Sequence, residues 1–379
     1  MDDRQTVHHV VLIPGLFGFA TIAGYDYFEH LERAIAERFA DAGVELRLSL
    51  VPSLPTSSIT ARAAEVARTV VRAARDDEGP IHLVGHSSGG LDARLLLSPS
   101  RRLRFGVDEL DWSRRVRTLL TINAPHYGTP LAAYFSTVSG TRLLYAVSLL
   151  TVTLLSLGRM PLSAVSALVS TLRAVDSGLG LELRLVDELT HGVLRFVGER
   201  GRREIADFMS HIRDDQRGIL QLMPEVAELF NATTRDDPDV RYGCIATFAP
   251  PPRPRRALSA ALSPLGALQL GVYTTLYGVA SRADIHGYAT PTPEQTRALA
   301  LAMGREAGPE HVDGIIPTLS MLWGELVWCG AADHLDVVGH FGDDRGMSDH
   351  VDWLHSGAHF SRRDFSAMTD ALCRFLLAG

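Results

Sequence analysis

The most conspicuous absence from the sequence is lysine. All 37 basic residues of the 379-residue chain are arginine. Catalysis through a lysine Schiff base needs a lysine side chain, and so does a nucleotide-binding phosphate loop. Both mechanisms are therefore excluded, and any chemistry must come from other side chains.

Cysteine is scarce as well. The three cysteines, Cys244, Cys329 and Cys373, are odd in number and far apart, and no Cys-x-x-Cys pair occurs. This spacing argues against a disulfide framework and against a structural zinc site. The polar start, Met-Asp-Asp-Arg-Gln-Thr, lacks the basic residues, apolar run and cleavage site of a signal peptide. We therefore expect a cytoplasmic protein.

The overall composition is that of a globular enzyme. Hydrophobic residues make up 46% of the chain and charged residues 21%, which distinguishes it from a disordered chain. The formal net charge is -7, whereas a nucleic-acid partner calls for a clustered positive surface. We expect no nucleic acid among the partners, and the sequence names no protein partner and no oligomeric state.

Apolar runs typical of buried strands alternate with segments that have helical spacing. Strands are predicted at residues 7–13, 44–51, 81–84, 116–122, 240–248 and 326–329, and helices at 27–42, 58–75, 90–97, 181–214, 297–305 and 365–377. This order implies right-handed crossovers. The sequence therefore predicts the α/β class, with a mostly parallel central sheet and helices on both of its faces.

Charge almost disappears after the fourth of these strands. Between residues 131 and 172, Arg142 and Arg159 are the only charged residues. The apolar run 143–157 is too short to span a bilayer, which takes about 20 residues. Three interpretations remain open: a cap over an active site, a buried pair of core helices, and a helix that lies on a membrane surface.

We favour the cap, because the segment is inserted directly after a strand of the sheet. This interpretation divides the chain into an α/β core at residues 1–130 and 236–379 and a helical cap or lid at residues 131–235. A cap this apolar is expected to line or cover a pocket for an apolar group.

The strongest motif is Gly85-His86-Ser87-Ser88-Gly89, which fits the Gly-x-Ser-x-Gly nucleophile elbow. It lies between a short apolar strand and a helix, the context that the motif requires. The turn is so sharp that Ser87 must take strained dihedrals, and side chains at the glycine positions would collide with the strand and the helix. Ser87 is therefore the predicted nucleophile.

A serine nucleophile needs a base, and the base needs an acid that orients it. In this fold the chain order is Ser, then Asp or Glu, then His. His334, just after the last predicted strand, and Asp313, in Val-Asp-Gly, have the right order. Asp284 competes with Asp313. The histidines that compete with His334 are His340, His350, His355 and His359.

The reaction also needs donors for the oxyanion that forms in the transition state. One is expected from the amide of Ser88, the residue after the nucleophile. The other should come from the loop after the first strand, Pro14-Gly15-Leu16-Phe17-Gly18. The Leu16 amide is the donor that we predict there.

At these residues the sequence resembles the bacterial true lipases of the α/β-hydrolase superfamily. The resemblance rests on five separate blocks in the same order, Val10–Gly18, Gly85–Arg94, Thr121–Pro130, Asp313–Pro317 and Asp333–Asp336. It implies that Asp313 and His334 complete the catalytic triad of Ser87, and it implies a lid after Pro130.

The resemblance also implies a metal. In those lipases, the aspartate two residues after the catalytic histidine often binds a calcium ion that braces the histidine loop. Asp336 has that position, although His340 stands where an amide oxygen ligand is expected, and calcium prefers oxygen. Pro14-Gly15 also replaces the usual His-Gly before the oxyanion loop, which makes this loop stiffer.

Together these observations predict a serine carboxylic ester hydrolase, of the lipase or esterase type, that acts on apolar acyl esters through an acyl-enzyme. No cofactor is required, and calcium at Asp336 is the only ion that we consider. The expected partners are an apolar ester and a lipid surface. Two alternatives stay open: an acyltransferase on the same fold, and a non-catalytic membrane-surface protein.

Overall fold

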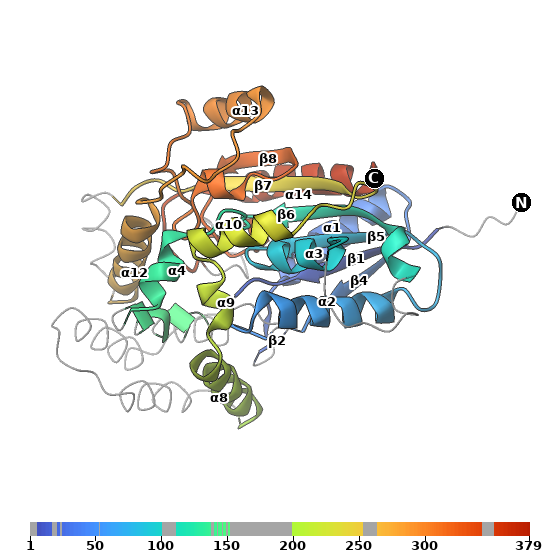
Figure 1. The fold of residues 1–379 in the computed structure, drawn as a ribbon, viewed down its shortest axis with the longest axis horizontal. Coiled ribbons are helices and arrows are strands. Elements are labelled where there is room, and N and C mark those ends of the chain that lie inside the picture. Colours follow the sequence, from blue (N-terminus) through green and yellow to red (C-terminus); the bar gives the residue numbers. More distant parts are fainter. Residues whose placement is uncertain are drawn as a thin grey trace, which may run out of the picture.

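The computed structural model confirms an α/β architecture built on one parallel sheet. It describes residues 6–16, 21–22, 25–52, 54–100, 111–137, 140–141, 143–145, 147–148, 151, 199–252, 264–342 and 352–379. The sheet has six strands in the order β4-β1-β5-β6-β7-β8, and every neighbouring pair is parallel (Figure 1). Their bounds are β1 His8–Ile13, β4 Leu46–Leu50, β5 Ile81–His86, β6 Val116–Ile122, β7 Arg241–Phe248 and β8 Glu325–Ala331.

Both faces of the sheet are covered, as predicted. In β1, Val10 and Leu12 pack on one side with α1 (Glu29–Asp41) and α14 (Arg362–Leu377). Alternate residues, such as Val11 and Ile13, pack on the other side with α2 (Ile59–Ala73) and α3 (Gly89–Leu97). Because side chains alternate along a strand, this pattern requires a hydrophobic layer on each face.

Further helices gather beyond the carboxyl ends of the strands. There α4 (Pro130–Phe135) contacts α12 (Pro264–Ala280), and Figure 1 shows both at the left of the sheet, whereas the chain ends at Gly379 on the opposite side. The elements α8 (Glu199–Asp214), α9 (Arg217–Leu220) and α10 (Pro224–Thr233) follow one another in the second half of the predicted cap.

The predicted cap is only partly within the described residues. The helix predicted at 181–214 is present as α8 from Glu199 onward, and its first part, like residues 152–198 as a whole, lies outside the described residues. The division into core and cap therefore stays a prediction. In the part of the chain that the structure describes, no helix is long and apolar enough to cross a membrane.

Some predicted boundaries were wrong. The helix predicted at 297–305 runs from Pro293 to Met303, because Thr292 and Gln295 form a capping box and Gly304, with φ of 69°, ends it in the left-handed region. The two helices α10 and α12 were not predicted. The second is apolar on nearly all sides and so shows no amphipathic period.

Two hydrogen-bonded histidines, the buried His82 and the half-buried His8, lie near the amino ends of β5 and β1. His82 Nε2 is 3.0 Å from His8 Nδ1, and His82 Nδ1 is 2.9 Å from Thr118 Oγ1. Burial, aided by the neighbouring His8 and His9, lowers the pKa of His82 from 6.5 to about 3. The folded protein therefore binds fewer protons here than the unfolded chain does between these two pH values.

The pair predicts an acid-sensitive fold. As the pH falls below about 6.5, protonation of His82 in the unfolded chain destabilises the native state by up to about 1.4 kcal/mol per pH unit. His82→Gln cannot titrate, so its free energy of unfolding should depend less steeply on pH between 7 and 4 than that of the wild type. Urea unfolding at several pH values measures both slopes; equal slopes would contradict the assignment.

Candidate active site

Ser87 occupies a sharp turn between the end of β5 and the start of α3. Its φ is +55°, in the left-handed region that residues other than glycine seldom adopt, and its amide donates to the Ile122 carbonyl at 2.8 Å. A Cβ on Gly89 would lie 2.3 Å from the carbonyl oxygen of Ile13. Only glycine allows this approach, so the motif serves the geometry for which it was predicted.

His334 and Asp313 form a buried pair. His334 lies just after β8, and its Nδ1 is 2.6 Å from Asp313 Oδ2. The other carboxylate oxygen of Asp313 accepts hydrogen bonds from the amides of Ile315 and Ile316, at 2.8 and 2.7 Å. Asp313 is fully buried, and these donors compensate the loss of water around its carboxylate. A carboxylate accepts, so His334 Nδ1 carries the proton and its Nε2 is left as the basic nitrogen.

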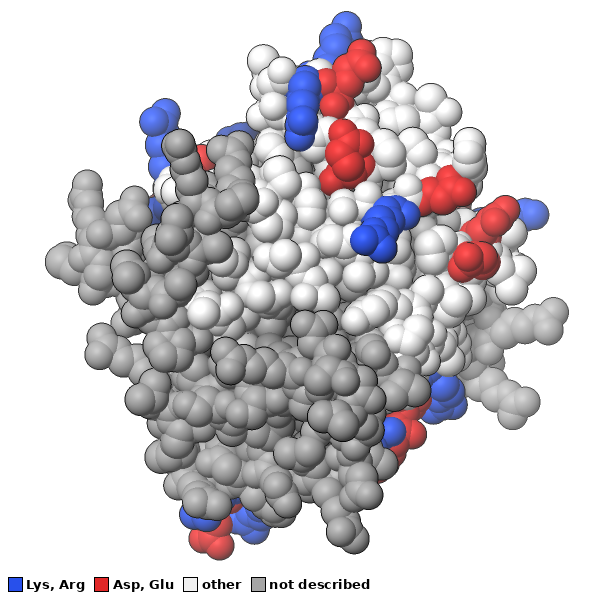
Figure 2. All heavy atoms as spheres, turned by 90° about the vertical axis from the view of Figure 1, so that its left-hand side faces the viewer, with Lys and Arg blue, Asp and Glu red and all other residues white. Residues whose placement is uncertain are grey.

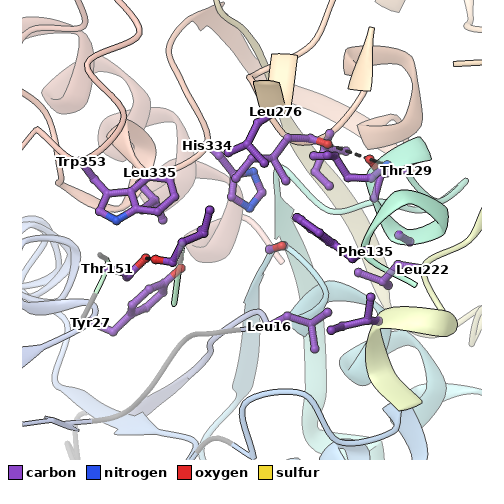
Figure 3. A pocket seen from close by; sticks show the side chains of 17 residues that line it. Leu16, Tyr27, Thr129, Phe135, Thr151, Leu222, Leu276, His334, Leu335 and Trp353 are labelled. Carbon is purple, nitrogen blue, oxygen red and sulfur yellow. Dashed lines mark hydrogen bonds between the residues drawn. The ribbon is translucent and has the colours of Figure 1, made fainter. Parts of the chain in front are cut away.

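Ser87 and His334 line the same pocket. Figure 3 shows His334 pointing toward the centre, with Phe135, Leu222 and Leu276 around it. The remaining wall is apolar except for Tyr27, Thr129 and Thr151, and it consists of Leu16, Tyr27, Thr129, Leu131, Ala132, Val147, Thr151, Ile219, Ile315, Ile316, Leu335 and Trp353. Several of these residues belong to the range predicted as the cap, so the described part of that range does line the pocket.

The competing residues lie elsewhere. The side chain of Asp284 is 78% exposed and accepts a hydrogen bond from the His286 amide. His340 donates from Nε2 to the Tyr27 carbonyl at 3.2 Å, and His355 is an exposed partner of Asp352. His359 is also exposed, and His350 lies outside the described residues. Among the described candidates, the structure brings His334 and Asp313 together beside Ser87.

The two residues predicted to supply the oxyanion donors are joined by a hydrogen bond. Leu16 lines the pocket, and its amide donates to the Ser88 hydroxyl at 2.8 Å. The preceding residue, Gly15, lies so close to Ser87 that a Cβ there would be 2.5 Å from Ser87 Cβ. The loop is therefore held against Ser87, and an oxyanion would have to replace the Ser88 hydroxyl as the acceptor of the Leu16 amide. Oxyanion binding by Leu16 and Ser88 stays a prediction.

Comparison with known proteins extends this picture. No family model matches the chain, and no curated protein matches its sequence. Among solved structures, lipase 1 from Pelosinus fermentans matches with a TM-score of 0.51 at 15% identity, over 97% of this chain and 99% of that one. The chain has the α/β-hydrolase fold.

Other matches carry similar names. The structure of EstA from Clostridium botulinum is 16% identical, with a TM-score of 0.49, and the match covers 97% of this chain and 88% of that one. For the Staphylococcus hyicus lipase the values are 15% identity and a TM-score of 0.49, over 99% and 96%. The bacterial-lipase resemblance in the sequence and the structure of the Pelosinus fermentans lipase point to the same fold.

A buried ion pair holds the loop that contains Pro14, Gly15 and Leu16. Arg62 on α2 pairs with Asp92 on α3, with its Nε at 2.8 Å and its Nη2 at 2.7 Å from Asp92 Oδ2. Its two terminal nitrogens also donate to the carbonyls of Pro14 and Gly15, at 2.7 and 3.2 Å. In a trans peptide the C=O and N–H point in opposite directions. Holding the Gly15 carbonyl therefore turns the Leu16 amide toward Ser88.

Neither member of this pair was predicted as a functional residue. Burial raises the pKa of Asp92 to about 6, although Arg62 opposes this shift. A signal was present in the sequence, since Arg62 lies at helical spacing between Ile59 and Val66, on the face that packs inward. Its partner could not be found that way, because Asp92 is 30 residues further along the chain.

Asp336, the predicted calcium ligand, is buried close to His334. Asp336 Oδ2 accepts a hydrogen bond from the Asp333 amide at 2.8 Å, and His340 is turned to the Tyr27 carbonyl. Within the described ranges, no group of three or more His, Cys, Asp or Glu side chains is placed to hold a metal ion. Calcium at Asp336 therefore stays a prediction from the resemblance alone.

The Arg62–Asp92 pair predicts a non-additive pattern of stability. Arg62→Met leaves the Asp92 carboxylate buried without its cation, so the free energy of unfolding should fall by about 3–5 kcal/mol. The double variant Arg62→Met/Asp92→Leu removes both charges and should regain most of this loss. Urea denaturation at neutral pH measures both values; a double variant no more stable than Arg62→Met would contradict the assignment.

Proposed function

We propose that this α/β-hydrolase is a serine carboxylic ester hydrolase. The observation that carries the proposal is that Ser87 and His334 line one apolar pocket, with Asp313 hydrogen-bonded to His334 behind it. A serine at a strained turn, a histidine with a free Nε2 and a buried carboxylate are the parts that nucleophilic acyl transfer requires. The fold shared with a solved bacterial lipase supports the same chemistry.

The proposed reaction proceeds through an acyl-enzyme. Ser87 Oγ attacks the ester carbonyl while His334 Nε2 takes its proton, and Asp313 stabilises the imidazolium that forms. The amides of Leu16 and Ser88 receive the developing oxyanion. His334 then protonates the leaving alcohol, and water, deprotonated by the same histidine, cleaves the ester bond to Ser87.

The pocket wall favours an uncharged, apolar acyl group. Among the described residues that line it there is no Asp, Glu or Arg, and aliphatic and aromatic side chains dominate. Figure 2 shows the molecule from the side of α4 and α12, where an uncharged area of described residues lies below and to the left of most of the charged side chains. Placing a charged acyl chain in such a pocket would remove it from water without a partner, at a cost of several kcal/mol.

One test separates His334 from its competitor. His334→Ala removes the general base and should lower ester turnover by about 10⁴-fold, whereas His340→Ala should stay active, because His340 bonds the Tyr27 carbonyl and does not line the pocket. Hydrolysis of 4-nitrophenyl butyrate measures both rates. The triad would be wrong if His340→Ala were inactive while His334→Ala hydrolysed the ester normally.

A second test addresses the acyl pocket. Across 4-nitrophenyl esters of increasing acyl length, kcat/KM should rise by up to about 4-fold for each methylene that is buried, until the pocket is filled. Leu222→Asn puts an amide in the wall and should flatten this rise, with little effect on the acetate ester.

The matched control is Leu229→Asn on α10, since the side chain of Leu229 is 65% exposed and lies outside the pocket. It should preserve the wild-type profile. If Leu222→Asn and Leu229→Asn both change the dependence of kcat/KM on acyl length, or if neither does, the acyl group binds elsewhere.

A further inference from the structure

A chain of hydrogen bonds links the nucleophile turn to the loop of His334. His86, the residue before Ser87, is fully buried and lies between two partners: its Nε2 is 2.9 Å from the His334 carbonyl oxygen, and its Nδ1 is 2.8 Å from the Tyr27 hydroxyl. A carbonyl can only accept, so His86 Nε2 carries the proton. Its Nδ1 is then an acceptor, and Tyr27 donates to it.

The hydrogen bond from His86 is the third that fixes the position of His334. The amide of His334 donates to the Asp313 carbonyl at 3.1 Å, and its Nδ1 donates to the Asp313 carboxylate. His86 holds the third point, the carbonyl oxygen. With the amide, the carbonyl and one ring nitrogen fixed, Nε2 is the polar atom of His334 that remains for the pocket. Asp313 orients the ring, whereas His86 fixes where the main chain of His334 lies relative to Ser87.

The charge state of His86 is also compatible with a position beside His334. Its burial, with His334 beside it, lowers its pKa well below the usual 6.5, so it stays neutral at physiological pH. The centroids of the two imidazole rings are only 4.8 Å apart. A cationic side chain at this position would disfavour the imidazolium that His334 must form, and a neutral donor avoids that penalty.

We infer that His86 is a positioning residue that sets the separation between Ser87 and His334. It does so by linking the loop of His334 to β5, the strand that leads to Ser87. Tyr27 fixes the tautomer of His86. The expected effect of His86 on rate rests on the proposed function. Its effect on the geometry of His334 does not depend on any activity. Because displacements of about 1 Å can cost about 100-fold in rate, this tie matters for turnover.

The test compares His86→Phe with His86→Gln. The first fills the space but donates nothing, and should lower kcat by about 100-fold with little change in KM. The second keeps an N–H that can reach the His334 carbonyl, and should recover activity to within about 10-fold of the wild type. His82→Gln is the matched control: it replaces another buried histidine of β5, away from the pocket, and should leave kcat unchanged.

A second readout needs no substrate. The His334 Nδ1 proton that bonds Asp313 should give a downfield proton NMR signal in the wild type and in His82→Gln, and the signal should broaden or vanish in His86→Phe. If the signal behaves this way but no ester is hydrolysed, the proposed function fails and the positioning role stands. If His86→Phe folds and keeps both the signal and kcat, the positioning role is wrong.

Tyr27→Phe keeps the inference testable if His86→Phe does not fold. It removes only the hydroxyl that bonds His86 Nδ1, and loss of one such hydrogen bond should lower kcat by about 2–10-fold. The downfield signal should broaden as well. An unchanged rate together with an unchanged signal in this variant would overturn the role assigned to Tyr27 and His86.

Discussion

The hydrogen bond between Asp313 and His334 is the interaction on which the arrangement of the pocket depends. It joins a fully buried carboxylate to an imidazole on another loop, at 2.6 Å. A charge buried this deeply needs compensation, and the amides of Ile315 and Ile316 provide it on the other carboxylate oxygen. The pair therefore fixes the tautomer of His334 and also the course of the loop that carries Asp313.

The sheet explains why these groups meet. Parallel strands have their carboxyl ends at one edge, so the segments after β1, β5 and β8 bring Leu16, Ser87 and His334 to the same place. Each segment is then held by a neighbour: Arg62 holds the carbonyls before Leu16, and His86 holds the carbonyl of His334. The sheet brings these residues to one edge, and local contacts of this kind fix their positions relative to one another.

Local patterns in the sequence were enough to predict the fold. The apolar strands and the glycines around Ser87 act over a few residues, so the sheet, its covering helices and the sharp turn could be predicted from short windows. A helix boundary such as Pro293 was missed because the capping box at Thr292 lies before the helical pattern begins.

Some contacts between distant segments could not be predicted. The choice between Asp313 and Asp284 depends on burial, which the sequence left open, and the structure places Asp284 at the surface. The partner of His86 is a main-chain carbonyl 248 residues away, and a main-chain atom has no sequence signature. Residues 152–198 lie outside the described part, so the cap remains a prediction from composition.

The most direct test of the account is to trap the acyl-enzyme. The protein is mixed with a 4-nitrophenyl ester, quenched with acid during turnover and analysed by mass spectrometry of the intact chain and its peptides. We expect a single added acyl group, carried by Ser87. Ester consumption with no acyl group on the protein, or with the acyl group on another residue, would contradict it.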